Sequence, residues 1–300
     1  MASILEYEAT SATDLMEFLS PLNEQWLKGN YIFRGHGRAE YELIPSVCRR
    51  GEGAFAAGST MRLFKDTSAA QVALECRILS RFLKGCDNSG LVVPGYSARF
   101  KDLFNRNSKN FSDAPGVWPG EDFYEVLAAA QHHGVPTRLL DWSRRSYVAA
   151  YFAATSSSFE YKSNDDKIAI WALDINKSSN WKFVKIIDPP GGTSKNLAAQ
   201  SGVFTMQVNT DLSDAAYTEV PLDDIGEIQS GLMKITMSNL YVPKLIELCA
   251  KFGVQGSTLF PGYEGVARDV VEFAQELVGM KYSPEHYEQD YSDFDINDHI

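Results

Sequence analysis

The chain has 300 residues, of which 44% are hydrophobic and 22% charged, the usual balance of a folded globular protein rather than a disordered one. Its net charge of -11 argues against general binding to nucleic acid through the phosphate backbone, which requires clustered lysine and arginine. No apolar run reaches the roughly 18 residues that span a bilayer, and the N-terminal residues lack the basic region of a signal peptide. We therefore expect a cytoplasmic protein that does not associate with membranes.

In the first part of the chain, residues 11–28 have apolar residues at helical spacing and predict one or two short helices. Residues 31–35 begin with three aromatic or β-branched residues and end with Arg34 and a glycine, which is typical of a strand that ends in a turn. The amphipathic pattern of residues 68–85 predicts a helix that ends at its glycine. Residues 86–120 are rich in Gly, Pro, Ser and Asn without a sustained period, so we expect a long irregular insertion there.

In the second part, the helical pattern that returns at Glu121 should stop near Gly134 and Pro136, and another helix should run to about Ala154. Short apolar runs bounded by turn residues then predict strands at 167–175, 201–208 and 231–237. Two further helices are predicted at 243–253 and at about 264–279. Helices first and strands mainly later indicate an α+β fold with a mixed, mainly antiparallel sheet and packed helices, in a single domain of residues 1–280 with a helical N-terminal segment.

Residues 281–300 form an acidic tail that also contains aromatic residues. After Lys281 there is no lysine or arginine, and the acids alternate with Tyr282, Tyr287, Tyr291 and Phe294. The tail is either a solvated terminus or a segment that docks on a basic partner, or back over a basic cleft, with its aromatic residues as anchors.

The cysteines and histidines do not predict a metal site. The four cysteines have no metal-ligand spacing, so we expect free thiols in a reducing compartment. His132 and His133 are adjacent, and on a helix they would point about 100° apart, which makes a shared metal ion difficult. The chain also lacks the phosphate-loop, dinucleotide-binding, serine-hydrolase and zinc-protease motifs.

The stretch 131–143 (QHHGVPTRLLDWS) concentrates polar side chains between two apolar segments. Arg138 and Asp141 flank two leucines, and partly buried charges must be paired or bound to a ligand. Two interpretations stay open: a structural ion pair, or an Arg138 that faces an anionic ligand while Asp141 orients it. Trp142 would then offer a flat apolar wall for a ring.

Arg34 is the second candidate for anion binding. It follows three strand-type residues and precedes Gly35 and Gly37, which predicts an open turn where a ligand can approach the backbone. Its planar guanidinium suits a phosphate or carboxylate, although a structural ion pair is the alternative.

These residues together resemble the FRG domain family. The resemblance rests on Phe33-Arg34-Gly35, a following Leu-Ile-Pro-Ser, a helix that carries Glu75, the block LAAAQHHGVPTRLLDWS, and the later stretches QSGVF and LFPGYEG. It spans roughly residues 31–275. Membership in this family does not itself imply a reaction.

A second resemblance, to mono-ADP-ribosyltransferases, concerns the order of motifs. In those enzymes a strand ends in aromatic-Arg-Gly, a Ser/Thr-rich strand then leads into an A-x-x-F helix, and a later strand carries an acid or glutamine. This chain keeps that order in residues 33–35, in residues 136–153 and in Gln200. The resemblance implies an ADP-ribosyltransferase-like arrangement and cleavage of NAD through an oxocarbenium-like state.

The resemblance also implies residue roles. Arg34 would bind the diphosphate, Trp142 or Tyr151 would form the wall for nicotinamide, and Gln200 or Asp141 would bind a ribose hydroxyl. The catalytic residues would be Arg34, Gln200 and Asp141, and NAD would contact Arg34, Gly35, His36, Thr137, Arg138, Trp142, Ser143 and Tyr151.

The implied function is that of a toxin or antiphage defence effector that modifies a nucleic acid or protein and is regulated by an antitoxin or similar partner protein. The chain departs from the pattern at Gln200, where these transferases usually have glutamate. The alternative hypothesis is a non-catalytic module in which Arg34, Arg138 and the two adjacent histidines bind an anionic ligand or partner.

Overall fold

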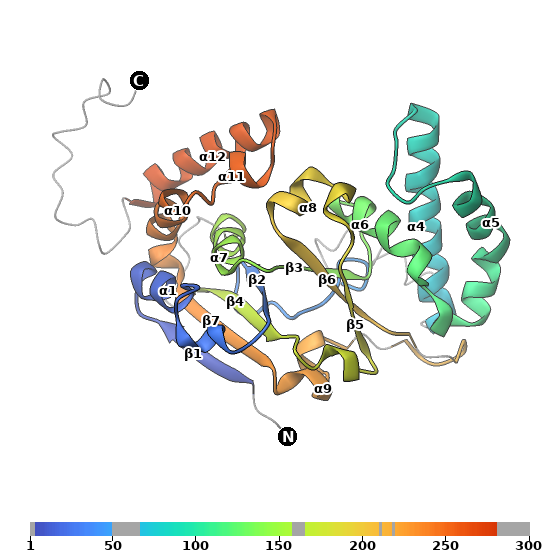
Figure 1. Cartoon of the computed structure of the whole chain (residues 1–300), viewed down its shortest axis with the longest axis horizontal. Helices are drawn as coiled ribbons and strands as arrows, with labels where there is room; N and C mark the ends of the chain where they lie inside the picture. Colours follow the sequence, from blue (N-terminus) through green and yellow to red (C-terminus); the bar gives the residue numbers. More distant parts are fainter. Residues whose placement is uncertain (1–3, 50–66, 158–165, 210–211, 218–219, 281–300) are drawn as a thin grey trace.

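The computed structural model describes residues 4–49, 67–157, 166–209, 212–217 and 220–280 (Figure 1). Within these ranges, one mixed sheet of seven strands has the order β1-β7-β4-β2-β3-β6-β5. All neighbouring strands are antiparallel except β1 and β7, which confirms the α+β prediction. The strands are β1 (Leu5–Ala9), β2 (Tyr31–His36), β3 (Leu139–Ser143), β4 (Lys167–Asp174), β5 (Val184–Ile187), β6 (Gly202–Gln207) and β7 (Leu232–Ser238).

Most helices lie over one face of this sheet, whereas α9 contributes Ile228 to the cluster on the opposite face (Figure 1). They are α1 (Ala12–Phe18), α2 (Glu24–Leu27), α4 (Ser68–Ser89), α5 (Ala98–Asp113), α6 (Tyr124–His132), α7 (Ser146–Thr155), α8 (Lys195–Ala199), α9 (Gly226–Gln229), α10 (Val242–Lys251), α11 (Gly256–Leu259) and α12 (Tyr263–Met280). No helix among the described residues combines the length and the apolarity needed to cross a bilayer.

The core consists of three clusters of buried apolar side chains. One joins α1, α7 and α10 to one face of β4 and β7, and a second joins α4, α5 and α6 to β3 and β6. The third covers the opposite face of the central strands. Strand β4 is buried on both faces because Ile170 belongs to the first cluster and its neighbour Trp171 to the third, as expected for a central strand whose side chains alternate.

The predicted irregular insertion at 86–120 is wrong. Helix α4 continues through Gly85 to Ser89 and ends before Gly90, which has a φ of 65°. Helix α5 then occupies 98–113 and buries three phenylalanines, at spacings of four and seven residues, in the second cluster. The asparagines and serines of this segment suggested a loop. The burial of the apolar stripe stabilises a helix despite them.

Other predictions for single elements have mixed outcomes. The strand at 31–35 and the three later strands are present, whereas β1, β3 and β5 were not predicted. The acidic tail at 281–300 lies outside the described residues.

Helix α7 packs against strand β2 at a distance that only glycine allows. A Cβ atom added to Gly35 would lie 2.0 Å from the carbonyl oxygen of Ala149, and one on Gly37 would lie 2.2 Å from that of Ser156. The facing side of α7 is built from alanines, among them Ala149 and Ala153. The predicted open turn is therefore wrong: Gly35 lies inside the strand, and the backbone that approaches it belongs to α7.

We expect Gly35→Ala to destabilise the fold by about 1–3 kcal/mol or more, because the backbone of α7 would have to move. Urea unfolding would measure the change. Gly85→Ala is the matched control: this glycine lies inside α4 with nothing within 4 Å of an added Cβ, so alanine should stabilise by about 0.5–1 kcal/mol. An unchanged unfolding midpoint for Gly35→Ala would contradict the packing described here.

Candidate functional site

The sheet is open between β2 and β3. Strand β2 pairs with β4 along its whole length, from Tyr31 to His36, but with β3 only at Phe33 and Ser143. Beyond that pair the two strands separate, and backbone groups that would bond in a closed sheet must find other partners.

Arg34 bridges this opening. Its Nη1 donates a hydrogen bond to the backbone oxygen of Asp141 at 2.7 Å, and the Asp141 carboxylate lies 3.6 Å from the same nitrogen. Burial lowers the pKa of Arg34, an effect that Asp141 opposes and nearby Arg49 reinforces. An arginine guanidinium keeps its proton in proteins, so Arg34 is a cation at the opening. Its side chain is 13% exposed.

His36 fixes the orientation of that guanidinium. Arg34 Nε donates to His36 Nε2 at 2.9 Å, so the other ring nitrogen, Nδ1, carries the proton and donates to the backbone oxygen of Tyr41 at 3.2 Å. Burial, together with the charges of Arg34, Arg49 and Lys234, lowers the pKa of His36 to about 3. With Nε and Nη1 engaged, Nη2 of Arg34 has no acceptor within the described ranges, so two N–H groups are available to a ligand.

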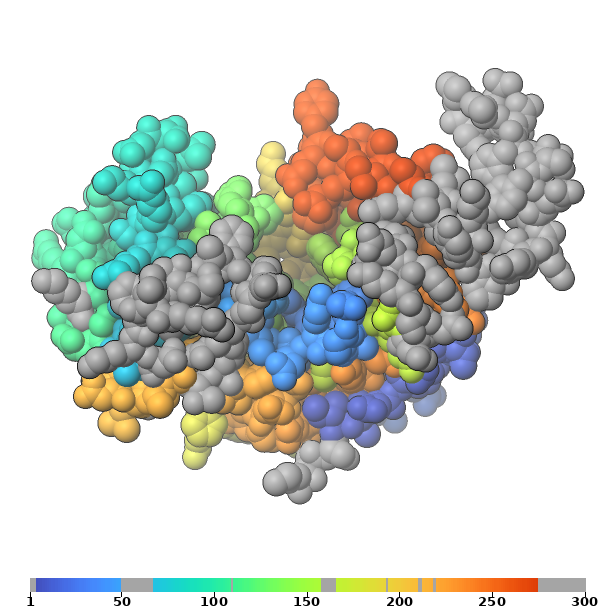
Figure 2. All heavy atoms as spheres, turned by 180° about the vertical axis from the view of Figure 1, so that it is seen from behind, coloured from blue at the N-terminus to red at the C-terminus, as the bar shows by residue number. Residues whose placement is uncertain are grey.

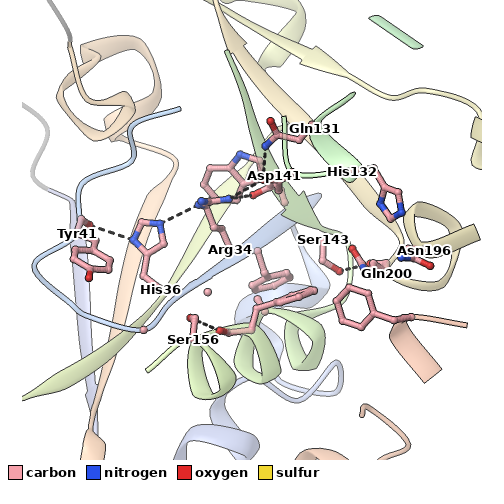
Figure 3. Close-up of a pocket in the computed structure, with 18 of the residues that line it drawn as sticks. Arg34, His36, Tyr41, Gln131, His132, Asp141, Ser143, Ser156, Asn196 and Gln200 are labelled. Carbon is pink, nitrogen blue, oxygen red and sulfur yellow. Dashed lines mark hydrogen bonds and ion pairs between the residues drawn. The ribbon is translucent and has the colours of Figure 1, made fainter. Parts of the chain in front are cut away.

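Asp141 and Gln131 lie beside Arg34 (Figure 3). The carboxylate of Asp141 accepts a hydrogen bond from Gln131 Nε2 at 2.8 Å, while 54% of the side chain is exposed to the cleft. Gln131 also accepts a hydrogen bond from the Thr137 hydroxyl at 2.6 Å. This chain of hydrogen bonds holds an exposed carboxylate next to the arginine.

Ser143 and Gln200 join the end of β3 to the end of α8. The Ser143 hydroxyl donates to the backbone oxygen of Gln200 at 2.7 Å and accepts from Arg145 N at 2.9 Å. The side-chain Nε2 of Gln200 donates to the backbone oxygen of Leu259 at 3.2 Å. This contact orients the amide, because only its nitrogen can face a carbonyl, and leaves Oε1 as the acceptor for a ligand.

One cleft of about 1370 Å³ is lined by Arg34, His36, Gln131, Asp141, Ser143 and Gln200. Its volume exceeds the roughly 300–1,000 Å³ of ordinary small-molecule sites. Figure 2 shows a hollow between the red C-terminal helices and the teal and green helices on the other side. The residues that line the cleft, many of them labelled in Figure 3, include Arg34, His36, Arg49, Gln131, His132, Asp141, Ser143, Asn196 and Gln200.

The opposite wall comes from residues late in the chain. Phe260 lies at the edge of α11, its ring 6.0 Å from that of Phe152, and Arg268 stacks over it at 4.1 Å. Arg268 also pairs with Glu264 at 2.9 Å. This wall thus provides an aromatic surface together with a positively and a negatively charged side chain.

Four residues that were expected to bind NAD are largely buried. The Trp142 ring is buried in the third cluster and donates to Thr205 Oγ1 at 2.9 Å. Tyr151 is 2% exposed and its hydroxyl donates to the buried carboxylate of Glu272. Tyr151 does not line the cleft, whereas Trp142, Phe152 and Phe260 are among the aromatic residues that do.

Arg138 and Thr137 are also internal. Arg138 Nε and Nη2 each donate to the Glu75 carboxylate at 2.6 Å, and both side chains are 5% exposed. Burial opposes the charge of Arg138, but Glu75 raises the pKa of the guanidinium above its ordinary value. The structural ion pair is therefore the correct interpretation of Arg138, with Glu75 rather than Asp141 as its partner. Thr137 is 4% exposed and is used in the hydrogen bond to Gln131.

The two adjacent histidines both line the cleft, with their ring centroids 5.0 Å apart. His132 lines the cleft, and burial and the neighbouring His133 lower its pKa while Glu264 and Asp141 oppose the shift. His133 is exposed and stacks near Phe82. In the part of the chain that the structure describes, no group of three or more His, Cys, Asp or Glu is placed to hold a metal ion, and all four cysteines are buried.

The sequence did not indicate several residues of the site. Gln131 was considered only as part of one motif, Phe260 and Glu264 only as part of the stretch LFPGYEG, and Arg268 was not considered. Once residues 139–143 are known to be a strand, alternation places Asp141 and Ser143 on one face and Trp142 on the other. The alternation of side chains along a strand was therefore the sequence signal that separates Asp141 and Ser143 from Trp142.

A comparison with protein-family models matches residues 29–162 to the FRG domain. The match includes β2, α6, β3 and α7, hence Arg34, His36, Gln131 and Asp141, and it ends before Gln200 and the wall formed by α12. Neither the curated proteins nor the solved structures yield a match.

The lowered pKa of His36 predicts a pH-dependent stability. The ordinary value of 6.5 applies to the unfolded chain, so below pH 6.5 the unfolded state binds a proton that the folded state does not. The stability is thus present above pH 6.5 and is lost as the pH falls towards 3. Between pH 7 and pH 5 the loss should be about 2 kcal/mol.

Urea unfolding of wild type and His36→Gln at these two pH values measures the effect, since the variant should lose about 2 kcal/mol less. The same substitution at the exposed His133 serves as the control. Equal losses in wild type and His36→Gln would show that His36 does not remain neutral in the folded protein.

Proposed function

We propose that this chain, whose residues 29–162 are an FRG domain, is an NAD-dependent ADP-ribosyltransferase that modifies a protein or nucleic acid, as a toxin or defence effector would. One observation supports this most directly: Arg34, Asp141 and Gln200, which lie far apart in the sequence, line the same cleft at the opening between β2 and β3.

The reaction would proceed by exchange at the ribose C1′ carbon. The bond from C1′ to the nicotinamide nitrogen breaks, nicotinamide leaves with the electron pair, and the ribose becomes oxocarbenium-like. An oxygen or nitrogen of the acceptor then bonds to C1′ and releases its proton. A site for this reaction needs to bind the diphosphate, hold the ribose and stabilise the positive charge.

The cleft contains groups suited to each task. The free Nη2 of Arg34 and the nearby Arg49 would bind the diphosphate, for which the arginine fork is well matched. Gln200 Oε1 would accept a hydrogen bond from a ribose hydroxyl. The exposed carboxylate of Asp141 would stabilise the cation or take the proton of the acceptor. Phe152 and Phe260 supply the aromatic surface for nicotinamide.

The first experiment incubates the protein with labelled NAD and a cell extract. Wild type should label a macromolecule, and protease or nuclease sensitivity should identify its class. Arg34→Ala should reduce the labelling by about 100-fold or more, since it removes the preorganised cation, and Gln200→Ala should also reduce it.

Arg106→Ala is the control, because this exposed arginine on α5 forms only a surface pair with Asp102. Arg34→Lys keeps the positive charge but lacks the planar guanidinium. Circular dichroism of each variant shows whether a loss of labelling is caused by loss of the fold. Full labelling by both Arg34→Ala and Gln200→Ala would exclude the mechanism. Binding of an anionic ligand without any transfer would favour the non-catalytic module instead.

A second prediction concerns the neutral side chain at position 200. Gln200→Glu should raise the transfer rate by about tenfold, because a carboxylate stabilises the oxocarbenium ion where the amide does not. The rate of nicotinamide release measures this. Asn196→Asp is the matched control, since it adds the same charge on the same helix and the same cleft. An equal rise in both variants would mean that position 200 has no specific role.

A further inference from the structure

His132 lines the cleft with a ring that the fold does not use for its own hydrogen bonds. Among the described residues, neither of its ring nitrogens has a hydrogen-bond partner, and the ring lies 5.0 Å from that of His133. By contrast, His36 uses both of its ring nitrogens in hydrogen bonds. An imidazole with an unused nitrogen in a cleft can exchange a proton with a bound molecule.

The position of His132 in the cleft is opposite to that of the anion-binding groups. Figure 3 shows Arg34 and His36 towards one end, and His132 towards the other, where Asn196 and Gln200 also lie. The volume of about 1370 Å³ is larger than an ordinary small-molecule site needs. The cleft therefore has room for a second molecule next to a dinucleotide, and His132 lies at the end that Arg34 does not occupy.

The surroundings of His132 keep its ring neutral before any reaction. Burial lowers the pKa of the ring, and His133, which precedes Gly134 at the end of the same helix, lowers it further. Glu264 from α12 and Asp141 from β3 raise it, although Arg268 pairs with Glu264 at 2.9 Å. Because the net shift is downward from 6.5, the neutral form of His132 predominates at neutral pH.

The same surroundings can also stabilise the ring once it has gained a proton. The carboxylates of Glu264 and Asp141 favour the charged form. His132 is the last residue of α6, where the negative end of the helix dipole favours a cation. A neutral base whose protonated form is supported by nearby carboxylates has the properties that general base catalysis requires.

We propose that His132 is the general base of the transfer reaction, and that the acceptor therefore presents an O–H or N–H group rather than a carboxylate. This inference rests on the proposed function. It deepens that function by naming the chemistry of the acceptor. An ionised carboxylate has no proton to lose, so a base beside it would have no task.

The proton transfer accompanies the exchange at C1′. The acceptor oxygen or nitrogen bonds to C1′, the bond from C1′ to the nicotinamide nitrogen breaks, and nicotinamide leaves with the electron pair. One ring nitrogen of His132 takes the proton of the acceptor and later releases it to solvent. Asp141 then remains available to stabilise the oxocarbenium-like ribose.

The test measures the rate at which labelled NAD transfers its label to macromolecules of a cell extract. His132→Ala should lower the maximal rate by about 100-fold, as loss of a general base does, and should change the KM for NAD by less than about twofold. Wild type should lose rate as the pH falls below 6.5, where His132 gains a proton, and the variant should lack this dependence. His132→Gln repeats both measurements, in case the alanine variant is destabilised.

Added imidazole distinguishes a chemical role from a structural one, because it supplies the missing base from solution. It should raise the rate of His132→Ala by about tenfold or more, in proportion to the concentration of neutral imidazole. Imidazole should not raise the rate of Arg34→Ala, which lacks a different group, or that of His133→Ala. Circular dichroism of each variant confirms that it is folded.

The failure of this inference and the failure of the proposed function give different results. If wild type shows no labelling that depends on Arg34, the proposed function is wrong and the role of His132 is wrong with it. If labelling depends on Arg34 but His132→Ala keeps the wild-type rate, or is not rescued by imidazole, only the role of His132 is wrong. Label that neutral hydroxylamine releases within minutes, as it does from carboxylate esters, would overturn the assignment of the acceptor.

Discussion

The architecture of the site depends on the bridge that Arg34 makes across the opening between β2 and β3. The strands share only the Phe33–Ser143 pair, so the carbonyl of Asp141 would otherwise lack a strand partner. The guanidinium supplies that hydrogen bond and is itself held by His36. A sheet that is open in this way gains a cleft, and the cation that bridges the opening is one of the arginines that line it.

Two buried contacts keep the opening from closing or widening. On one side, α7 packs directly on the backbone of β2 at Gly35 and sets the position of that strand. On the other side, the Glu75–Arg138 pair joins α4 to the residue just before β3, with Trp118 Nε1 as a further donor to Glu75 at 2.9 Å. Removing one member of such a buried pair leaves an uncompensated charge and costs about 3–5 kcal/mol, so the two edges of the cleft have rigid supports.

The sequence alone predicted the fold class and the strand that carries Arg34, because these follow from local periodicity. It also drew attention to residues 131–143, but it did not separate their roles. Arg138 and Asp141 are three residues apart and were considered together, whereas the partner of Arg138 is 63 residues earlier in the chain. Pairings of that kind arise from tertiary packing, and no local pattern encodes them. The wall formed by Phe260 and Arg268 was missed for the same reason.

The cleft has contributions from residues 33 to 49, 131 to 156, 196 to 200 and 260 to 268. During synthesis, a nascent chain that has reached only residue 162 contains the residues matched to the FRG domain, including Arg34 and Asp141, but it lacks Gln200 and the α12 wall. The cleft can therefore assemble only after residues up to Arg268 have been translated. A nascent chain that stops at residue 162 therefore lacks two of the segments that line the cleft.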